Sequence, residues 1–168
     1  MNAHRPRILI VDDEPAFCRA TARALSANGY AADVVSDPRA AVGQLVVNLR
    51  LRIPYEIVLL DVVMERSGLD VLRDLRAADP DVEVIMVSAH RDSSYAREAR
   101  SRGAGDLLYK PIGTSALVRA IEAARERWEG ALFGARQEIT DVTELLRRSN
   151  AYVAARRLRE DHGIARPG

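Results

Sequence analysis

Short aliphatic runs alternate with stretches of helical periodicity along the first 112 residues. Continuous apolar runs without polar alternation are typical of strands that are buried on both faces of a sheet. Each run is followed by a segment whose apolar residues have the spacing of an amphipathic helix. The strands expected on this basis are Arg7–Val11, Ala32–Val35, Glu56–Leu60, Val82–Val87 and Asp106–Tyr109. Strands that alternate with helices form parallel sheets, so the sequence predicts an α/β fold with a doubly wound, five-stranded parallel sheet, (βα)5.

The composition excludes several classes of protein. Hydrophobic residues make up 48% and charged residues 29% of the chain, and the formal net charge is +1. These values exclude bulk disorder, and a near-neutral chain gives no indication of a nucleic-acid or membrane partner. Cys18 is the only cysteine, which excludes an intrachain disulfide. Because no apolar run is long enough for a membrane span or a signal peptide, we expect a cytoplasmic protein.

Polar side chains follow four of the expected strands at the point where each strand ends. They are Asp12 and Asp13 after the first strand, Asp61 after the third, Ser88 after the fourth and Lys110 after the fifth. The carboxyl ends of parallel strands meet at one edge of a sheet, and ligands bind there. We therefore expect these five side chains to converge on one site.

The chemistry of this set indicates a phosphoryl-acceptor site. Three carboxylates in one pocket repel each other unless a cation lies among them, and oxygen-only ligation favours Mg²⁺ or Mn²⁺. Lys110 is the only lysine among 25 basic residues, and an ammonium group is a point charge suited to a phosphate anion. A Ser88 hydroxyl can hydrogen-bond a phosphoryl oxygen, and a carboxylate at a strand end can form an acyl phosphate. The sequence thus predicts a Mg²⁺-dependent phosphoaspartate site with Asp61 as acceptor.

Four segments resemble the signature blocks of response-regulator receiver domains of two-component signalling. They are RILIVDDEP (7–15), IVLLDVVM (57–64), VIMVSAH (84–90) and GAGDLLYKP (103–111). The resemblance covers about residues 5–128 and implies the flavodoxin-like fold of chemotaxis regulators, with strand order 2-1-3-4-5. Residues 129–168 then form a helical C-terminal extension.

The resemblance also implies roles for individual residues. Asp12 and Asp13 would bind Mg²⁺, Asp61 would accept the phosphoryl group, and the backbone carbonyl of Val63 would complete the metal ligation. Ser88 matches the switch hydroxyl and Lys110 the family's lysine, which precedes a cis Pro111. The phosphoryl donor would be a sensor histidine kinase or a histidine phosphotransfer protein. The protein would not be an enzyme beyond its own phosphorylation and autodephosphorylation.

Several positions depart from the family pattern. Leu107 stands where the family has an aromatic switch residue, and Tyr109 lies two positions later on the same strand face. Glu65 adds a carboxylate to the loop after Asp61, where Gly68 comes one residue early. By this resemblance, Val63 and His90 match the positions that tune the lifetime of the phosphoryl group in the family. Because Val63 cannot position an attacking water, we expect slow autodephosphorylation.

The extension leaves three interpretations open. The first is a helix for homodimerisation or docking. Leu132, Ile139, Val142, Leu146 and Val153 fall close to a heptad seam, but Ala135, Ser149 and Arg156 complete it poorly. The second is a small helix-turn-helix within Val142–Ile164, with a polar break at Ser149–Asn150 and arginines for DNA at positions 156 and 157. The third is a linker helix toward an effector domain.

Two other functions remain as alternatives. A degenerate receiver would fold but never be phosphorylated, although the complete set of site residues argues against it. A phosphatase of the haloacid dehalogenase type needs a second Asp two residues after the first-strand nucleophile. Asp12 is followed instead by Asp13, Glu14 and Pro15.

Overall fold

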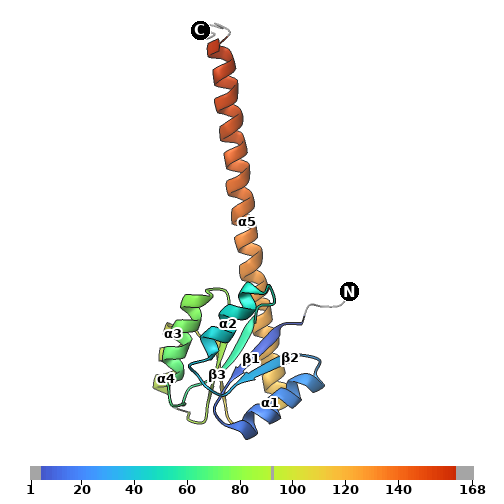
Figure 1. Cartoon of the computed structure of the whole chain (residues 1–168), viewed down its shortest axis with the longest axis vertical. Coiled ribbons are helices and arrows are strands. Elements are labelled where there is room, and N and C mark those ends of the chain that lie inside the picture. The colour runs from blue at the N-terminus through green and yellow to red at the C-terminus, as the bar shows by residue number, and fades with distance from the viewer. Residues whose placement is uncertain (1–4, 92, 162–168) are drawn as a thin grey trace. The chain divides into compact units, whose positions relative to one another are not determined.

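The computed structural model describes residues 5–91 and 93–161. Five strands alternate with five helices along this part of the chain (Figure 1). The strands are β1 (Arg7–Val11), β2 (Ala31–Val35), β3 (Ile57–Asp61), β4 (Glu83–Ser88) and β5 (Asp106–Tyr109). The helices are α1 (Pro15–Ala27), α2 (Ala41–Arg50), α3 (Gly68–Ala78), α4 (Ser93–Ser101) and α5 (Thr114–Asp161).

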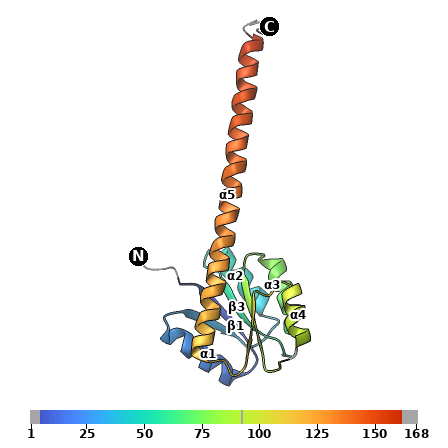
Figure 2. The same ribbon diagram turned by 180° about the vertical axis from the view of Figure 1, so that it is seen from behind.

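All strands are parallel and lie in the order β2-β1-β3-β4-β5, which confirms the predicted fold. The α2–α3 side of the sheet faces the viewer in Figure 1, and α1 with the first part of α5 covers the opposite side in Figure 2. Crossovers of this doubly wound kind bring every strand's carboxyl end to the same edge. The loops that carry the polar residues therefore lie at that edge.

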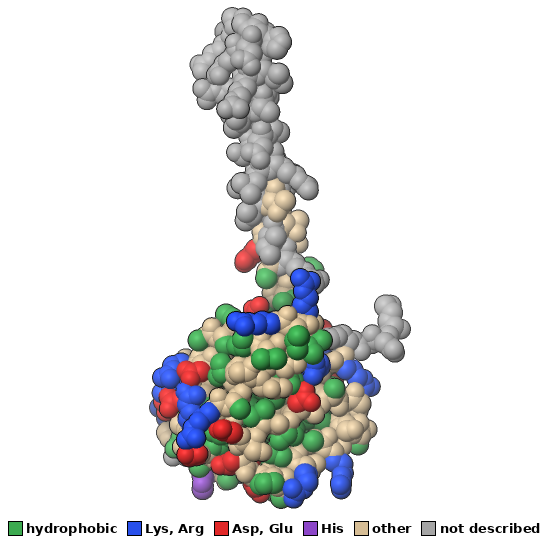
Figure 3. Space-filling view, viewed as in Figure 1, with side chains coloured by type: hydrophobic (Ala, Val, Ile, Leu, Met, Phe, Trp, Pro, Cys, Tyr) green, Lys and Arg blue, Asp and Glu red, His purple; other side chains and the backbone are tan. Residues whose placement is uncertain are grey.

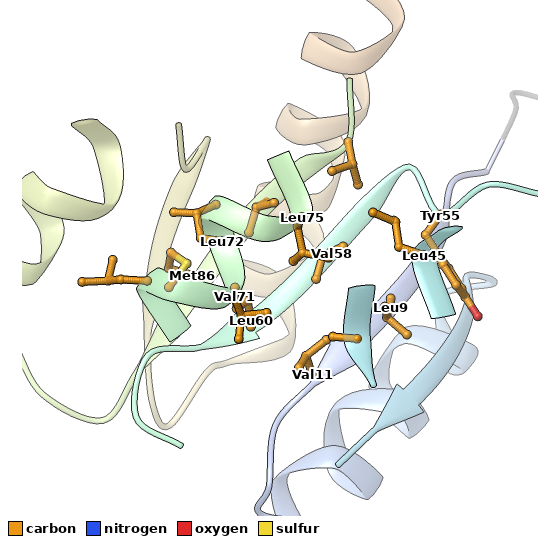
Figure 4. Close-up of a cluster of buried hydrophobic side chains, with 14 of the residues drawn as sticks. Leu9, Val11, Leu45, Tyr55, Val58, Leu60, Val71, Leu72, Leu75 and Met86 are labelled. Carbon is orange, nitrogen blue, oxygen red and sulfur yellow. The ribbon is translucent and has the colours of Figure 1, made fainter. Parts of the chain in front are cut away.

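The aliphatic runs form strands because both faces of the sheet are covered. Ile8 and Ile10 of β1 pack into the core beneath α1 and α5, whereas Leu9 and Val11 pack into the core beneath α2 and α3. Figure 4 shows the second core, where Leu72 of α3 meets the sheet. All five side chains are fully buried. Burial of such side chains on both faces stabilises the sheet by about 2 kcal/mol each.

Charged side chains of both signs alternate over α3 and α4 (Figure 3). Arg102 pairs with Glu98 at 2.6 Å and lies 3.8 Å from Asp70, and Arg66 pairs with Asp74. Exposed pairs of this kind contribute little stability.

Helix α5 continues without a turn to Asp161. The turn expected at Ser149–Asn150 for a helix-turn-helix is not formed, and Ile164 lies outside the described residues. The chain divides into two compact units between Glu129 and Gly130. Within the described residues, no helix combines the length and the apolarity needed to cross a bilayer.

Candidate functional site

Three carboxylates meet at the carboxyl ends of β1 and β3. Asp12, Asp13 and Asp61 each offer an oxygen, and these oxygens all lie within 4.8 Å of one another. Asp12 is 1% exposed and Asp61 is buried, whereas Asp13 is exposed. Backbone N–H groups hold the two buried carboxylates: Glu14 donates to Asp12 Oδ1 at 2.9 Å, and Val63 donates to Asp61 Oδ1 at 3.3 Å. The structure thus brings together the acidic residues that the sequence singled out.

Lys110 balances these charges from the end of β5. Its Nζ lies 2.7 Å from Asp12 Oδ2 and 3.5 Å from Asp61 Oδ2. Its backbone N–H donates to the carbonyl of Ser88 at 2.8 Å, and the peptide bond to Pro111 is cis. Residues at the carboxyl ends of β1, β3 and β5 therefore form one charge cluster, as the parallel arrangement of the strands predicts.

The electrostatics of the cluster favour a bound cation. Burial raises the pKa of Asp61, and the Asp12 charge raises it further, while the Val63 N–H and Lys110 oppose the rise. Burial lowers the pKa of Lys110, but the close contact with the Asp12 carboxylate and the charge of Asp61 outweigh it, so the pKa is raised. The ammonium group is therefore charged at neutral pH, and ionised Asp61 is held at a cost in folding free energy.

The donor set fits a hard divalent ion. All three clustered side chains offer carboxylate oxygens, which Mg²⁺ and Mn²⁺ prefer. Asp12 Oδ2 is buried and accepts no hydrogen bond of acceptable geometry from any described residue. Among the ion pairs of the described residues, Asp12 pairs only with Lys110, whose Nζ lies 2.7 Å from Asp12 Oδ2. A buried carboxylate oxygen whose acceptor sites are not used by hydrogen bonds is suited to ligate a metal ion.

Ser88 lies at the end of β4 with its hydroxyl engaged by its own loop. The Oγ donates to the carbonyl of His90 at 2.9 Å and accepts the N–H of His90 at 3.0 Å. Ser88 is buried, whereas His90 is exposed. The hydroxyl must leave the His90 carbonyl before it can donate a hydrogen bond to an anion at Asp61.

The departures from the family pattern have distinct surroundings. Leu107 packs against the core beneath α2 and α3. Tyr109 lies opposite Ser88 in the β4–β5 register, and the guanidinium of Arg91 stacks 5.0 Å from the centre of its ring.

Glu65 is not one of the clustered carboxylates. It pairs instead with Arg39 at 2.7 Å on the exposed surface. Val63 is 53% exposed and presents an apolar side chain to solvent. The loop after Asp61 therefore adds no further carboxylate to the metal cluster.

Sequence reasoning missed two neighbours of Lys110, both on the first turn of α1 or just before it. Glu14 Oε2 lies 3.3 Å from Lys110 Nζ, and the ring centre of Phe17 lies 4.2 Å from it. In the sequence, Phe17 has the spacing of an apolar-face residue of α1, which by itself indicates only packing against the core. The available signal for its contact with Lys110 was its position four residues after Asp13, which places it on the first turn of α1, close to the site.

The chain is similar in sequence to known proteins. The sequence model described as "Response regulator receiver domain" matches residues 8–122. Response regulator MprA of Mycolicibacterium vanbaalenii is 37% identical over 123 residues, which are 72% of this chain and 51% of that protein. Nitrogen assimilation regulatory protein NtrX of Azorhizobium caulinodans is 35% identical over 129 residues, 73% of this chain and 27% of that protein. The chain spans about half of the length of MprA and less of NtrX.

Solved structures show the same fold. A response regulator receiver domain protein from Clostridium thermocellum superposes with a TM-score of 0.67 and 26% identity, covering 74% of this chain and 97% of that one. NtrX from Brucella abortus, in a complex with ADP, has a TM-score of 0.69 and 27% identity, covering 83% of this chain and 30% of that one.

Proposed function

Because the chain belongs to the family of response regulator receiver domains of two-component signalling, we propose that Asp61 is its phosphoryl acceptor. The observation that carries this proposal is the position of Lys110 Nζ, 2.7 Å from Asp12 and 3.5 Å from Asp61. A charged ammonium held at a buried carboxylate is suited to bind the oxygens of a phosphoryl group on that carboxylate. In this proposal residues 5–128 are the receiver and residues 129–168 are the extension that transmits its state.

Four groups would hold a divalent cation, Mg²⁺ or Mn²⁺. They are the carboxylates of Asp12, Asp13 and Asp61 and the backbone carbonyl of Val63. When bound, the cation would neutralise negative charge on the transferring group. The oxygen-only donor set supports this assignment.

The phosphoryl donor would be phosphohistidine of a sensor histidine kinase or of a phosphotransfer protein. A carboxylate oxygen of Asp61 attacks phosphorus, so that an O–P bond forms while the P–N bond breaks. The electron pair of the P–N bond stays on the imidazole, which takes up one proton from solvent. Lys110 binds the anionic oxygens, and Ser88 donates its hydroxyl to one of them after leaving His90. Apart from the phosphohistidine donor and, for later hydrolysis, water, no further substrate is needed.

The test combines intact mass with oligomeric state. Incubation with acetyl phosphate and Mg²⁺ is expected to add one phosphoryl group, about 80 Da, to the wild type and nothing to Asp61→Asn. Size-exclusion chromatography with light scattering on the same samples shows whether the extension pairs two copies or leaves a monomer. A folded wild type that gains no mass would make the protein a degenerate receiver, a constitutive interaction module.

We also expect the phosphorylated form to persist. Hydrolysis of phosphorylated Asp61 requires a positioned water, and the exposed Val63 side chain offers it no hydrogen bond. Removal of acetyl phosphate followed by timed intact-mass spectra gives the half-life, which we expect to exceed a minute. Val63→Asn is expected to shorten it, because an amide can hold the attacking water. A wild-type half-life below a minute contradicts this prediction.

A further inference from the structure

The ammonium group of Lys110 is enclosed by acidic groups and one aromatic ring. The Phe17 ring centre lies 4.2 Å from Nζ, and the side chain of Lys110 is only 14% exposed. Phe17 itself is half-buried and packs against the core beneath α1 and α5. The ring is therefore fixed by the helix and the core, and it covers one side of the ammonium group.

The ring acts on Lys110 differently from the carboxylates. A cation over the face of an aromatic ring is attracted by the ring's quadrupole, and the attraction grows when water is excluded. Glu14, at 3.3 Å, is an exposed carboxylate that competes with a phosphoryl anion for the ammonium hydrogens. Phe17 carries no charge and accepts no conventional hydrogen bond. It can hold the ammonium in place while leaving its N–H groups free for an anion.

We propose that Phe17 is a positioning residue for Lys110, holding its ammonium group at Asp61 during phosphoryl transfer. This inference rests on the proposed phosphorylation of Asp61. It assigns to an apolar residue of α1 an effect on the rate of that reaction, exerted through Lys110. A leucine at position 17 would keep the apolar packing of α1 but lose the attraction for the cation.

The first test observes the contact itself. Because Lys110 is the only lysine of the chain, lysine labelled with ¹³C and ¹⁵N gives one side-chain spectrum. The Hε resonance of Lys110 is expected upfield of its position in the unfolded protein, owing to the ring current of Phe17. The shift should disappear in Phe17→Leu and persist in Phe17→Tyr. A wild-type resonance at the unfolded position overturns the contact.

The second test measures the reaction. The rate constant for phosphorylation by acetyl phosphate with Mg²⁺ is expected to fall about 5- to 30-fold in Phe17→Leu, the factor that a largely desolvated cation–π contact supplies. Phe17→Tyr is expected to restore the rate to within about twofold, because its ring face is also attractive to cations. Phe133 is the only other phenylalanine and is 72% exposed on α5. Phe133→Leu is the matched control and should leave the rate unchanged.

The outcomes separate this inference from the function on which it rests. If wild type and Phe17→Leu are phosphorylated at equal rates, the positioning role is wrong and the acceptor assignment stands. If wild type gains no phosphoryl group, both fail, and the Lys110 spectrum then shows only whether the contact exists. Circular dichroism at the assay temperature establishes that each variant is folded. A rate lost in Phe17→Leu and not rescued by Phe17→Tyr indicates a packing role and also overturns the inference.

Discussion

Phosphorylation of Asp61 is expected to slow by about 100-fold or more when Lys110 is replaced by methionine. The ammonium contacts both buried carboxylates, Asp12 and Asp61. Methionine keeps the apolar stem of the lysine and removes the charge that would meet the phosphoryl oxygens. The rate constant for the gain of one phosphoryl group from acetyl phosphate, measured by intact mass with Mg²⁺ present, gives the effect.

The same substitution is expected to destabilise the fold when divalent cations are removed. Loss of one partner from a buried ion pair leaves an uncompensated charge, which costs about 3–5 kcal/mol. The pKa of Asp61 is already raised by burial and by Asp12, with Lys110 opposing the rise, so Lys110→Met raises it further. A carboxyl pKa above its unfolded value favours folding as the pH falls through it, so the destabilisation should be smaller at acidic pH than at neutral pH. Urea unfolding with EDTA at both pH values measures this.

Arg91→Met is the matched control for Lys110→Met. Arg91 lies in the loop after β4, and its guanidinium stacks on the ring of Tyr109 of β5. The substitution therefore also removes one cation near the same edge of the sheet. We expect a change in stability within about 0.5 kcal/mol, as for an ordinary surface substitution. A phosphorylation rate that falls equally in both variants would show that net charge, rather than the ammonium at Asp61, determines the rate.

The strands and the convergence of the site were predictable because both follow from backbone periodicity. Alternate residues of a strand face opposite sides of the sheet, so a run such as Ile8–Val11 must be covered on both sides. Strand bounds differed from the expected ones by a residue at β2, β3 and β4. The apolar letters of a run do not show which residue makes the first ladder hydrogen bond.

The contacts around Lys110 were not predictable because they depend on tertiary packing. The rotation of α1 about its axis places Phe17 over Lys110, and burial of Cys18 and Leu25 in the core sets that rotation. From the sequence, the Ser88 hydroxyl could hydrogen-bond either an anion at Asp61 or the backbone of its own loop. In the structure it bonds the backbone of His90, because the loop after β4 brings that residue close. Such choices are decided by contacts between segments that lie far apart in the sequence.

Gly68→Ala is expected to destabilise the protein by about 1–3 kcal/mol and to slow phosphorylation, because the chain has no room for a methyl group there. A Cβ at Gly68 would lie 2.1 Å from the backbone oxygen of Asp61 and 2.9 Å from Cα of Val62. Backbone atoms cannot rotate aside as a flexible side chain can. Either the start of α3 or the loop that carries the acceptor must move. This close approach gives a physical reason for the glycine that follows Ser67 in the short loop.

Gly43→Ala supplies a control in which the opposite sign is expected. Gly43 lies inside α2, and a Cβ there would have no heavy atom within 4 Å. Alanine in a helix interior is favoured over glycine by about 0.5–1 kcal/mol, so this variant should be more stable than the wild type and be phosphorylated at the same rate. Urea unfolding and the acetyl phosphate assay on both variants measure the contrast. Gly68→Ala could be as stable and as rapidly phosphorylated as Gly43→Ala only if the backbone at Asp61 and Val62 moved freely away from α3. That result would show that the close fit between this backbone and Gly68 does not position Asp61.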